Sequence, residues 1–214
     1  MRVLGIDPGL ERCGFAVLER KDRRTRAVSF GTVTTGSGPV ATRLAELATK
    51  LRSVIREHRP EVAAIEQLFV NRNLRTVMTV GQASGVALLV VAEAGLDIAG
   101  YTPSQVKLAV TGSGNAPKQQ VGFMVKALVG LPALARPADS ADAIAVALCH
   151  IHHLEAPRPR NPEDAAATVE EEWLRRAAPT SPSLARGRPA GELPARRADP
   201  AAARPPGRGG QRAP

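Results

Sequence analysis

Short apolar runs that each stop at a carboxylate constrain the fold of this chain more than any other feature. Val3–Ile6 stops at Asp7, and a Pro-Gly turn signal follows at once. A second run, Val62–Ile65, stops at Glu66. Runs this short that are apolar throughout are typical of interior strands of a parallel sheet. The pattern predicts two buried strands whose ends each present an acid, in positions from which the two acids can converge.

Two further acids, Asp139 and Asp142, stand three residues apart in an alanine-rich segment. A helix would place both on one face, and the small side chains around them would let that helix lie close on a sheet. Each acid alone has an ordinary explanation, such as the helix dipole for acids near a helix start. Together with Asp7 and Glu66 they predict one site, because four like charges repel unless a cation neutralises them. Such oxygen ligands suit Mg²⁺, with Mn²⁺ as a substitute.

The order of apolar and turn-rich segments predicts an α/β protein. Three strand candidates with short links suggest an antiparallel meander, and an amphipathic helix follows between Pro39 and Pro60. Two further strands alternate with helices, which gives a mixed five-stranded sheet with helices on both faces. The predicted strands are Arg2–Asp7, Gly14–Arg20, Ala27–Thr35, Val62–Glu66 and Asp97–Tyr101, with a hairpin loop at Lys21–Arg26. The apolar face of the amphipathic helix is formed by Leu44, Leu47, Ala48, Leu51, Val54 and Ile55. The other predicted helices cover Asn73–Ala94, a short segment opened by Thr102-Pro103, Pro117–Val129 and Pro137–His153.

The composition changes after about residue 155. Residues 156–214 hold 11 of the 18 prolines and 11 arginines but few large apolar side chains. Such a segment cannot bury enough surface to offset the entropy of ordering. We therefore expect one compact domain over residues 1–155 and a disordered basic tail over residues 156–214. The formal net charge of +9 favours a nucleic-acid partner, and with the clustered acids it indicates a metal-dependent nuclease.

Several other classes of protein are disfavoured. Cys13 and Cys149 are far apart and form no disulfide framework or zinc pattern. The histidines beside Cys149, at His150, His152 and His153, are spaced too closely on one helix end for a good tetrahedral zinc site. The longest apolar stretch is too short to cross a membrane, and the first residues lack a secretory signal pattern. We expect a soluble cytoplasmic protein without a membrane partner.

Four segments, taken in order, resemble the RuvC family of bacterial Holliday-junction resolvases. They are Met1–Gly14, Ala64–Phe69, Thr102–Lys107 and Ala138–His150. The resemblance spans about residues 1–155 and leaves the tail uncovered. It implies a ribonuclease-H-like fold, whose order of strands and helices is the order predicted above. It also implies a structure-selective endonuclease that resolves four-way DNA junctions in recombination and repair.

The resemblance further implies roles for individual residues. The family's catalytic acids, which bind two Mg²⁺ ions per active site, correspond by position to Asp7, Glu66, Asp139 and Asp142. Lys107 and Lys118 correspond to basic residues near the scissile phosphate. Phe69 corresponds to an aromatic residue that the family uses against a base at the junction. Pro117 stands directly before Lys118, where the family usually has a polar or acidic residue.

By the same resemblance, the chain would act on four-way junction DNA as a homodimer, leave 5′-phosphate and 3′-hydroxyl ends, and cooperate with the RuvA–RuvB branch-migration complex. A stripe on the second long helix, formed by Val77, Gly81, Gly85 and Leu88, either packs in the core or pairs with a second copy. Two alternatives remain open: a YqgF-like nuclease of the same fold and a non-catalytic junction-binding protein. The Lys107 segment argues against the first, and acids clustered where phosphate must bind argue against the second.

Overall fold

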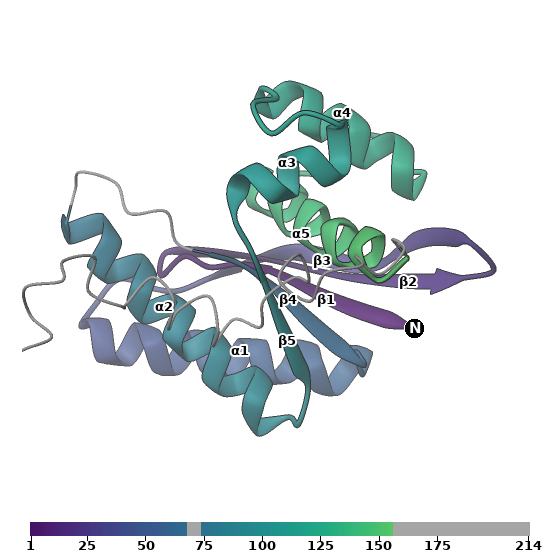
Figure 1. Ribbon diagram of the computed structural model, residues 1–214. Helices are drawn as coiled ribbons and strands as arrows, with labels where there is room; N and C mark the ends of the chain where they lie inside the picture. Colours follow the sequence, from purple (N-terminus) through teal and green to yellow (C-terminus); the bar gives the residue numbers. More distant parts are fainter. Residues whose placement is uncertain (68–73, 156–214) are drawn as a thin grey trace, which may run out of the picture. The chain divides into compact units, whose positions relative to one another are not determined.

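The first strand of the chain lies at the centre of the sheet. The computed structural model describes residues 1–67 and 74–155. β1 (Arg2–Asp7) pairs antiparallel with β2 (Arg12–Lys21) and parallel with β4 (Val62–Glu66). β3 (Arg24–Thr34) and β5 (Asp97–Tyr101) are the edge strands, so the order is β3-β2-β1-β4-β5 (Figure 1). The predicted mixed five-stranded sheet is confirmed.

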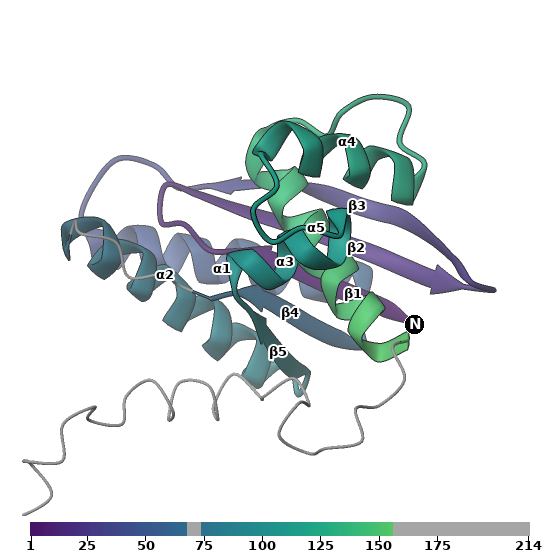
Figure 2. The ribbon, with the colours of Figure 1, turned by 45° about the horizontal axis from the view of Figure 1, so that its top comes forward.

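Helices cover both faces of this sheet (Figure 2). α1 (Val40–His58) and α2 (Leu74–Glu93) pack on one face, and α5 (Ala138–Glu155) lies across the other. α3 (Pro103–Thr111) and α4 (Lys118–Val129) pack against α5. Two separate apolar clusters result, one under α1 and α2 and one under α3, α4 and α5. Within residues 1–67 and 74–155, none of the helices has the length and apolar character to cross a membrane.

Local signals set most of the helix ends. α1 begins directly after Pro39 and ends at His58, where Arg59 takes a left-handed conformation with φ of 46°. Of its predicted apolar face, Leu47, Ala48 and Leu51 are buried and the remaining members are partly buried. α3 begins with a full capping box, in which the Thr102 hydroxyl accepts from the Gln105 backbone N–H and the Gln105 side chain accepts from the Thr102 N–H.

The predicted hairpin loop at Lys21–Arg26 is wrong in its extent. Asp22 and Arg23 alone form the turn, with φ values of 49° and 62°, and β2 and β3 continue up to them on either side. Two successive left-handed residues match the right-handed twist of the paired strands, which is why a two-residue turn suffices. The strands are therefore longer than predicted, and the hairpin extends past the other strands (Figure 1).

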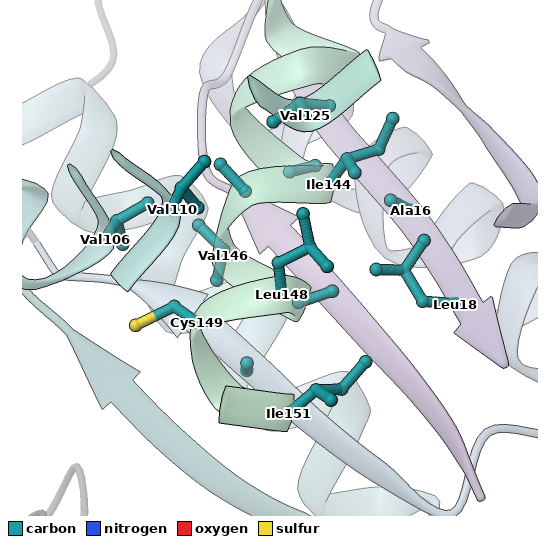
Figure 3. Close-up of a cluster of buried hydrophobic side chains, with 14 of the residues drawn as sticks. Ala16, Leu18, Val106, Val110, Val125, Ile144, Val146, Leu148, Cys149 and Ile151 are labelled. Carbon is teal, nitrogen blue, oxygen red and sulfur yellow. The ribbon is translucent and has the colours of Figure 1, made fainter. Parts of the chain in front are cut away.

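α5 lies unusually close to the sheet because both surfaces are made of small residues. A Cβ atom on Gly5 of β1 would lie 2.2 Å from the carbonyl oxygen of Ala143 and 2.9 Å from the Cβ of Ala147. The longer side chains of α5 point to either side of this contact, Ile144 and Leu148 toward β2 and α4, and Val146 and Cys149 toward α3 (Figure 3). The predicted close approach of an alanine-rich helix is confirmed, and a glycine in the sheet makes it possible.

Candidate active site

Asp7 and Glu66 lie on the same face of the sheet, where β1 and β4 end. Ile6 and Ile65, which precede them, are paired in register and pack in the cluster under α1 and α2. Because side chains alternate along a strand, the two acids face the opposite way, toward α5. The register of β1 and β4, and the burial of Ile6 and Ile65 on the opposite face, therefore bring the two strand-end acids together as predicted.

α5 brings Asp139 and Asp142 to the same place. Asp139 stands in the first turn of this helix, and Asp142 follows one turn later. The helix can reach the strand ends because Gly14, the cross-strand partner of Asp7, has no side chain. A Cβ atom at Gly14 would lie 2.1 Å from the carbonyl oxygen of Asp139. The four acids predicted from the sequence thus gather at one edge of the sheet, and their charges influence one another.

Burial and nearby negative charge raise the pKa of both Asp7 and Glu66. Burial is the largest cause that raises the pKa of Asp7, to about 8. The pKa is also raised by the charges of Glu66, Asp142 and Asp139 and by a hydrogen bond with Glu66. The pKa of Glu66 is also raised, chiefly by burial, although its hydrogen bond with Asp7 and the nearby Lys118 and Lys107 oppose the shift. Both carboxyl groups therefore favour the neutral form more than an exposed carboxyl group does.

The other two acids are compensated by cations. The Arg12 guanidinium donates to Asp139 Oδ2, with Nη2 at 2.7 Å and Nε at 2.8 Å. The Thr32 hydroxyl also donates to this oxygen, at 3.4 Å. Lys118 Nζ lies 3.3 Å from Asp142 Oδ2. Arg12 and Lys118 therefore offset two of the four carboxylates, and the raised pKa of Asp7 favours its neutral form.

The chemistry of this donor set fits a divalent cation. All four side chains offer carboxylate oxygens, the ligands that Mg²⁺ and Mn²⁺ prefer, and a cation would neutralise the repulsion that now raises the pKa of Asp7. As they stand, no three acidic, histidine or cysteine side chains in the described ranges are grouped closely enough to hold a metal ion. Arg12 engages Asp139 and Lys118 engages Asp142, so metal binding would require these contacts to rearrange.

Lys118 and Lys107 both lie beside the acids, in different surroundings. Lys118 is the first residue of α4 and its side chain is 82% exposed, so it is free to reach a bound phosphate. The Asp142 charge raises the pKa of Lys118. Lys107 on α3 is partly buried and acts on Glu66 through its charge. Pro117 forms the N-cap of α4 without a side-chain hydrogen bond and leaves Lys118 at the acid cluster.

Sequence analysis missed three residues of this site. Arg12 and Thr32 donate hydrogen bonds to Asp139, and Gly14 leaves space for the backbone of Asp139 because it has no side chain. Arg12 and Gly14 fall within the first segment that resembles RuvC, but neither residue type signals a carboxylate partner 127 residues away. Phe69, the predicted aromatic contact to a base, lies outside the described residues.

The histidine cluster on α5 is engaged in other contacts. His150 Nδ1 forms a buried hydrogen bond of 2.8 Å with the Tyr101 hydroxyl. His152 Nδ1 lies 3.0 Å from the Ala109 carbonyl oxygen, and His153 Nδ1 lies 2.8 Å from that of Cys149. Tyr101 is the register partner of Glu66, so the Tyr101–His150 bond ties the strand end beside Glu66 to α5.

The small-residue stripe of α2 divides between two faces. Leu88 packs in the cluster under α1 and α2, whereas Gly85 is exposed, with open space where a side chain would stand. The exposed face of α2 instead combines Met78, Gln82, Gly85 and Leu89, at helical spacing. Met78 is 65% exposed and Leu89 is 55% exposed. We call these four residues the α2 face.

Comparison with known proteins gives consistent matches. The profile of the family described as "Crossover junction endodeoxyribonuclease RuvC" matches residues 3–150. A protein of that name from Syntrophomonas wolfei is 44% identical over 153 residues, which are 71% of this chain and 89% of the relative. Another, from Frankia alni, is 46% identical over 199 residues, or 92% of each chain. This match extends past residue 155, whereas the family profile ends at residue 150 and does not include the tail.

A solved structure agrees with the sequence matches. The structure described as T. thermophilus RuvC in complex with a Holliday junction substrate has a TM-score of 0.69 and 35% identity to this chain. It covers 72% of this chain and 94% of that one. A second Thermus thermophilus RuvC structure has a TM-score of 0.66 and 34% identity. The predicted ribonuclease-H-like resolvase fold is confirmed.

Proposed function

We propose the function of this chain from one premise: it belongs to the RuvC family of crossover junction endodeoxyribonucleases. It resolves four-way (Holliday) DNA junctions by hydrolysing phosphodiester bonds, in homologous recombination and DNA repair. The observation that carries this function is the gathering of Asp7, Glu66, Asp139 and Asp142 beside Lys118 at the end of β1. The match runs through all of these positions, which favours this function over that of a YqgF-like nuclease.

Four acids placed where a phosphate must approach also argue for catalysis over binding alone. Burial and repulsion raise the pKa of Asp7 to about 8, and a protein that only binds DNA would gain affinity by losing these acids. Perturbed carboxyl groups of this kind are typical of catalytic centres. A non-catalytic junction-binding protein has no use for them.

We assign the metal site to Asp7, Glu66, Asp139 and Asp142, which would hold two Mg²⁺ ions, with Mn²⁺ as a substitute. When bound, such ions lower the pKa of water and neutralise the charge that develops on the leaving oxygen. The Lys118 ammonium group, exposed beside Asp142, would bind a nonbridging oxygen of the scissile phosphate. Lys107 would add positive potential at Glu66.

The proposed reaction is in-line hydrolysis. A water oxygen bonds to phosphorus as the bond from phosphorus to the 3′ oxygen breaks, and the proton lost by water balances the proton gained by the leaving 3′ oxygen. The products are a 5′-phosphate and a 3′-hydroxyl. Phe69 is proposed to contact a base at the junction.

We further propose a homodimer, because a two-fold symmetric enzyme presents equivalent sites to the two opposed strands of a junction. The α2 face is the proposed contact between the copies, since it exposes Met78 and Leu89 around Gly85, where a second helix can approach closely. By family membership, we propose cooperation with the RuvA–RuvB branch-migration complex in the cytoplasm. The proposed domain organisation is a nuclease domain over residues 1–155 and a basic tail over residues 156–214.

One cleavage assay tests the central proposal. The full-length chain is incubated with a mobile four-way junction, a linear duplex and an RNA–DNA hybrid, each with and without Mg²⁺. We expect paired cuts in the junction alone, only with Mg²⁺, and products that ligase can seal. Equal cutting of the linear duplex, or preferred cutting of the hybrid, would contradict the junction assignment.

A further inference from the structure

We propose that the β2–β3 hairpin is a second DNA-binding surface, which contacts the phosphate backbone of a junction arm at a distance from the cut. This inference rests on the proposed function. Its contact groups are Lys21, Arg23 and Arg24, here called the hairpin cations. All three are exposed at the tip of the hairpin.

The tip of the hairpin carries an excess of positive charge, because Asp22 is the one acid among residues 20–26. Arg20 Nε lies 2.5 Å from Glu155 Oε1, and Arg26 Nη2 lies 2.5 Å from Glu19 Oε2. In the part of the chain that the structure describes, no ion pair or side-chain hydrogen bond engages the hairpin cations. Asp22, which stands between Lys21 and Arg23, offsets only one of the three positive charges. The remaining charges repel each other, so a bound polyanion would relieve an unfavourable arrangement.

The hairpin presents these charges on a well-defined support. The turn holds two residues, and the Arg20 guanidinium braces it by donating to the carbonyl oxygen of Arg23 and, at 3.1 Å, to the Thr25 hydroxyl. The hairpin projects past the first residue of the chain in both ribbon views (Figure 1, Figure 2). A hollow of about 420 Å³ separates Arg23 and Arg24 from the ends of α4 and α5. The cations therefore have open space on the side of the sheet that also carries the catalytic acids.

The distance from the acids suits a duplex arm. Asp7 pairs with Gly14 in β2, and Lys21 lies seven residues further along the same strand. At about 3.3 Å per residue, this separation is roughly 23 Å. One DNA strand has a phosphate about every 3.4 Å along the axis, so the hairpin would meet the backbone about seven nucleotides from the cut. A four-way junction supplies such an arm on each side of the cut strand.

The chemistry of the hairpin favours DNA over an acidic protein. Residues 20–26 contain no apolar side chain, whereas stable protein interfaces centre on buried aromatic or aliphatic anchors. Phosphate contacts need only cations on a suitable spacing and carry no base specificity. The hairpin would therefore add affinity for an arm without affecting which sequence is cut.

The test is a binding titration in EDTA, with the full-length protein and labelled four-way junctions. Two kinds of junction are used, with arms of about 20 base pairs and with loop-closed arms of about 5 base pairs, too short to reach the hairpin. The double variant Arg23→Gln/Arg24→Gln should bind the long-arm junction on the order of tenfold more weakly and flatten its salt dependence by about two per bound subunit. It should bind the short-arm junction as the wild type does.

Arg56→Gln/Arg59→Gln is the matched control. Like the hairpin variant, it removes two positive charges and changes one arginine in a left-handed conformation, because Arg59 has a φ of 46°. Arg56 lies in the last turn of α1, and Arg59 follows the end of this helix. The control should bind both junctions like the wild type. If a lower Tm shows that Arg23→Gln impairs folding, the variant Lys21→Gln/Arg24→Gln repeats the test. It changes no residue with a left-handed backbone conformation.

Three results would overturn the proposal: unchanged long-arm binding by the hairpin variants, an equal loss with short arms, or an equal loss in the control. Unchanged DNA binding would indicate that the hairpin cations bind an acidic protein partner instead of DNA. Cutting by the wild type is measured separately with Mg²⁺. A wild type that fails to cut speaks against the nuclease assignment, whereas the binding comparison reports on the hairpin alone.

Discussion

The carbonyl oxygen of Asp139 occupies the space that a side chain on Gly14 would need, only 2.1 Å from the position of its Cβ atom. Gly14 is also the register partner of Asp7. A single missing methyl group therefore allows the first turn of α5 to stand over the strand pair that carries Asp7. The position of Asp139 in the site depends on β2 as much as on its own helix.

Gly14→Ala should destabilise the protein and abolish cutting. The contact is with backbone, which cannot rotate away, so we expect a loss of roughly 3 kcal/mol and a Tm lower by about 6–12 °C. Thermal unfolding and the junction-cleavage assay check both effects. Gly122→Ala on α4, where the added methyl group meets nothing within 4 Å, is the control and should raise stability slightly. A Gly14→Ala protein with wild-type Tm would contradict the packing argument.

Removing one acid should separate cutting from binding. Asp7→Asn, Glu66→Gln and Asp142→Asn should each lower the cleavage rate by on the order of 10³-fold. Junction affinity should stay the same or increase, because negative charge facing phosphate is removed. Asp139→Asn should act in the same direction. Single-turnover cleavage and a binding titration measure the two quantities, with Glu57→Gln on the exposed surface of α1 as control. Loss of binding in all the acid variants would indicate misfolding.

Lys118→Ala and Lys107→Ala should weaken cutting more than binding. Lys118 Nζ lies 3.3 Å from Asp142, and Lys107 acts on Glu66, so both charges lie at the proposed position of the reacting phosphate. We expect a loss of rate of about 10²-fold with a salt slope for binding close to that of the wild type. Lys118→Arg should recover part of the rate. If instead affinity for all DNA falls and the slope flattens, these lysines serve as general phosphate contacts.

Metal-free protein should lose stability as the pH rises toward 8. The pKa of Asp7 is raised from 3.8 to about 8 in the folded state, so folding takes up a proton that the unfolded chain has released. This contribution is complete below the unfolded pKa and is lost as the pH rises through the folded pKa. The pKa of His150 is lowered, which has the opposite effect around its unfolded pKa.

Comparison with Asp7→Asn isolates the aspartate from the histidine. In EDTA, the Tm of the wild type should fall relative to that of Asp7→Asn as the pH increases from about 5 to about 8.5. Added Mg²⁺ should restore the wild type at high pH and should act less on the variant, since the cation replaces the proton at this site. If the Tm of the two metal-free proteins changes with pH in parallel, the pKa of Asp7 is not raised in the folded state.

Leu89→Glu should produce a monomer. Leu89 is 55% exposed on the α2 face, and a carboxylate there would have to be buried when two copies pair. Light scattering should report half the mass of the wild type, and junctions should be nicked on one strand at a time. Leu154→Glu changes an equally exposed leucine, also at 55%, on α5 and should remain a dimer. An unchanged mass for Leu89→Glu would place the dimer contact elsewhere.

The sequence alone was enough to locate the strands and helices that carry the acids. β1, β4 and β5 have the predicted bounds, because short apolar runs between turn signals are recognisable without knowing their partners. The capping residues Thr102 and Gly130 and the prolines at 39 and 60 act on their own neighbours, so the helix ends follow from local chemistry. Asp7, Glu66, Asp139 and Asp142 could be named for the same reason.

Only the tertiary structure decided how these acids are held and balanced. The bond from Arg12 to Asp139 spans 127 residues of sequence, and the effect of Glu66 on the pKa of Asp7 requires two strands to be adjacent. The two-residue turn at Asp22 and Arg23 depends on the twist of the paired strands, which no residue in the predicted loop signals. Local patterns state what a residue prefers, whereas distance, burial and repulsion exist only once distant segments are packed together.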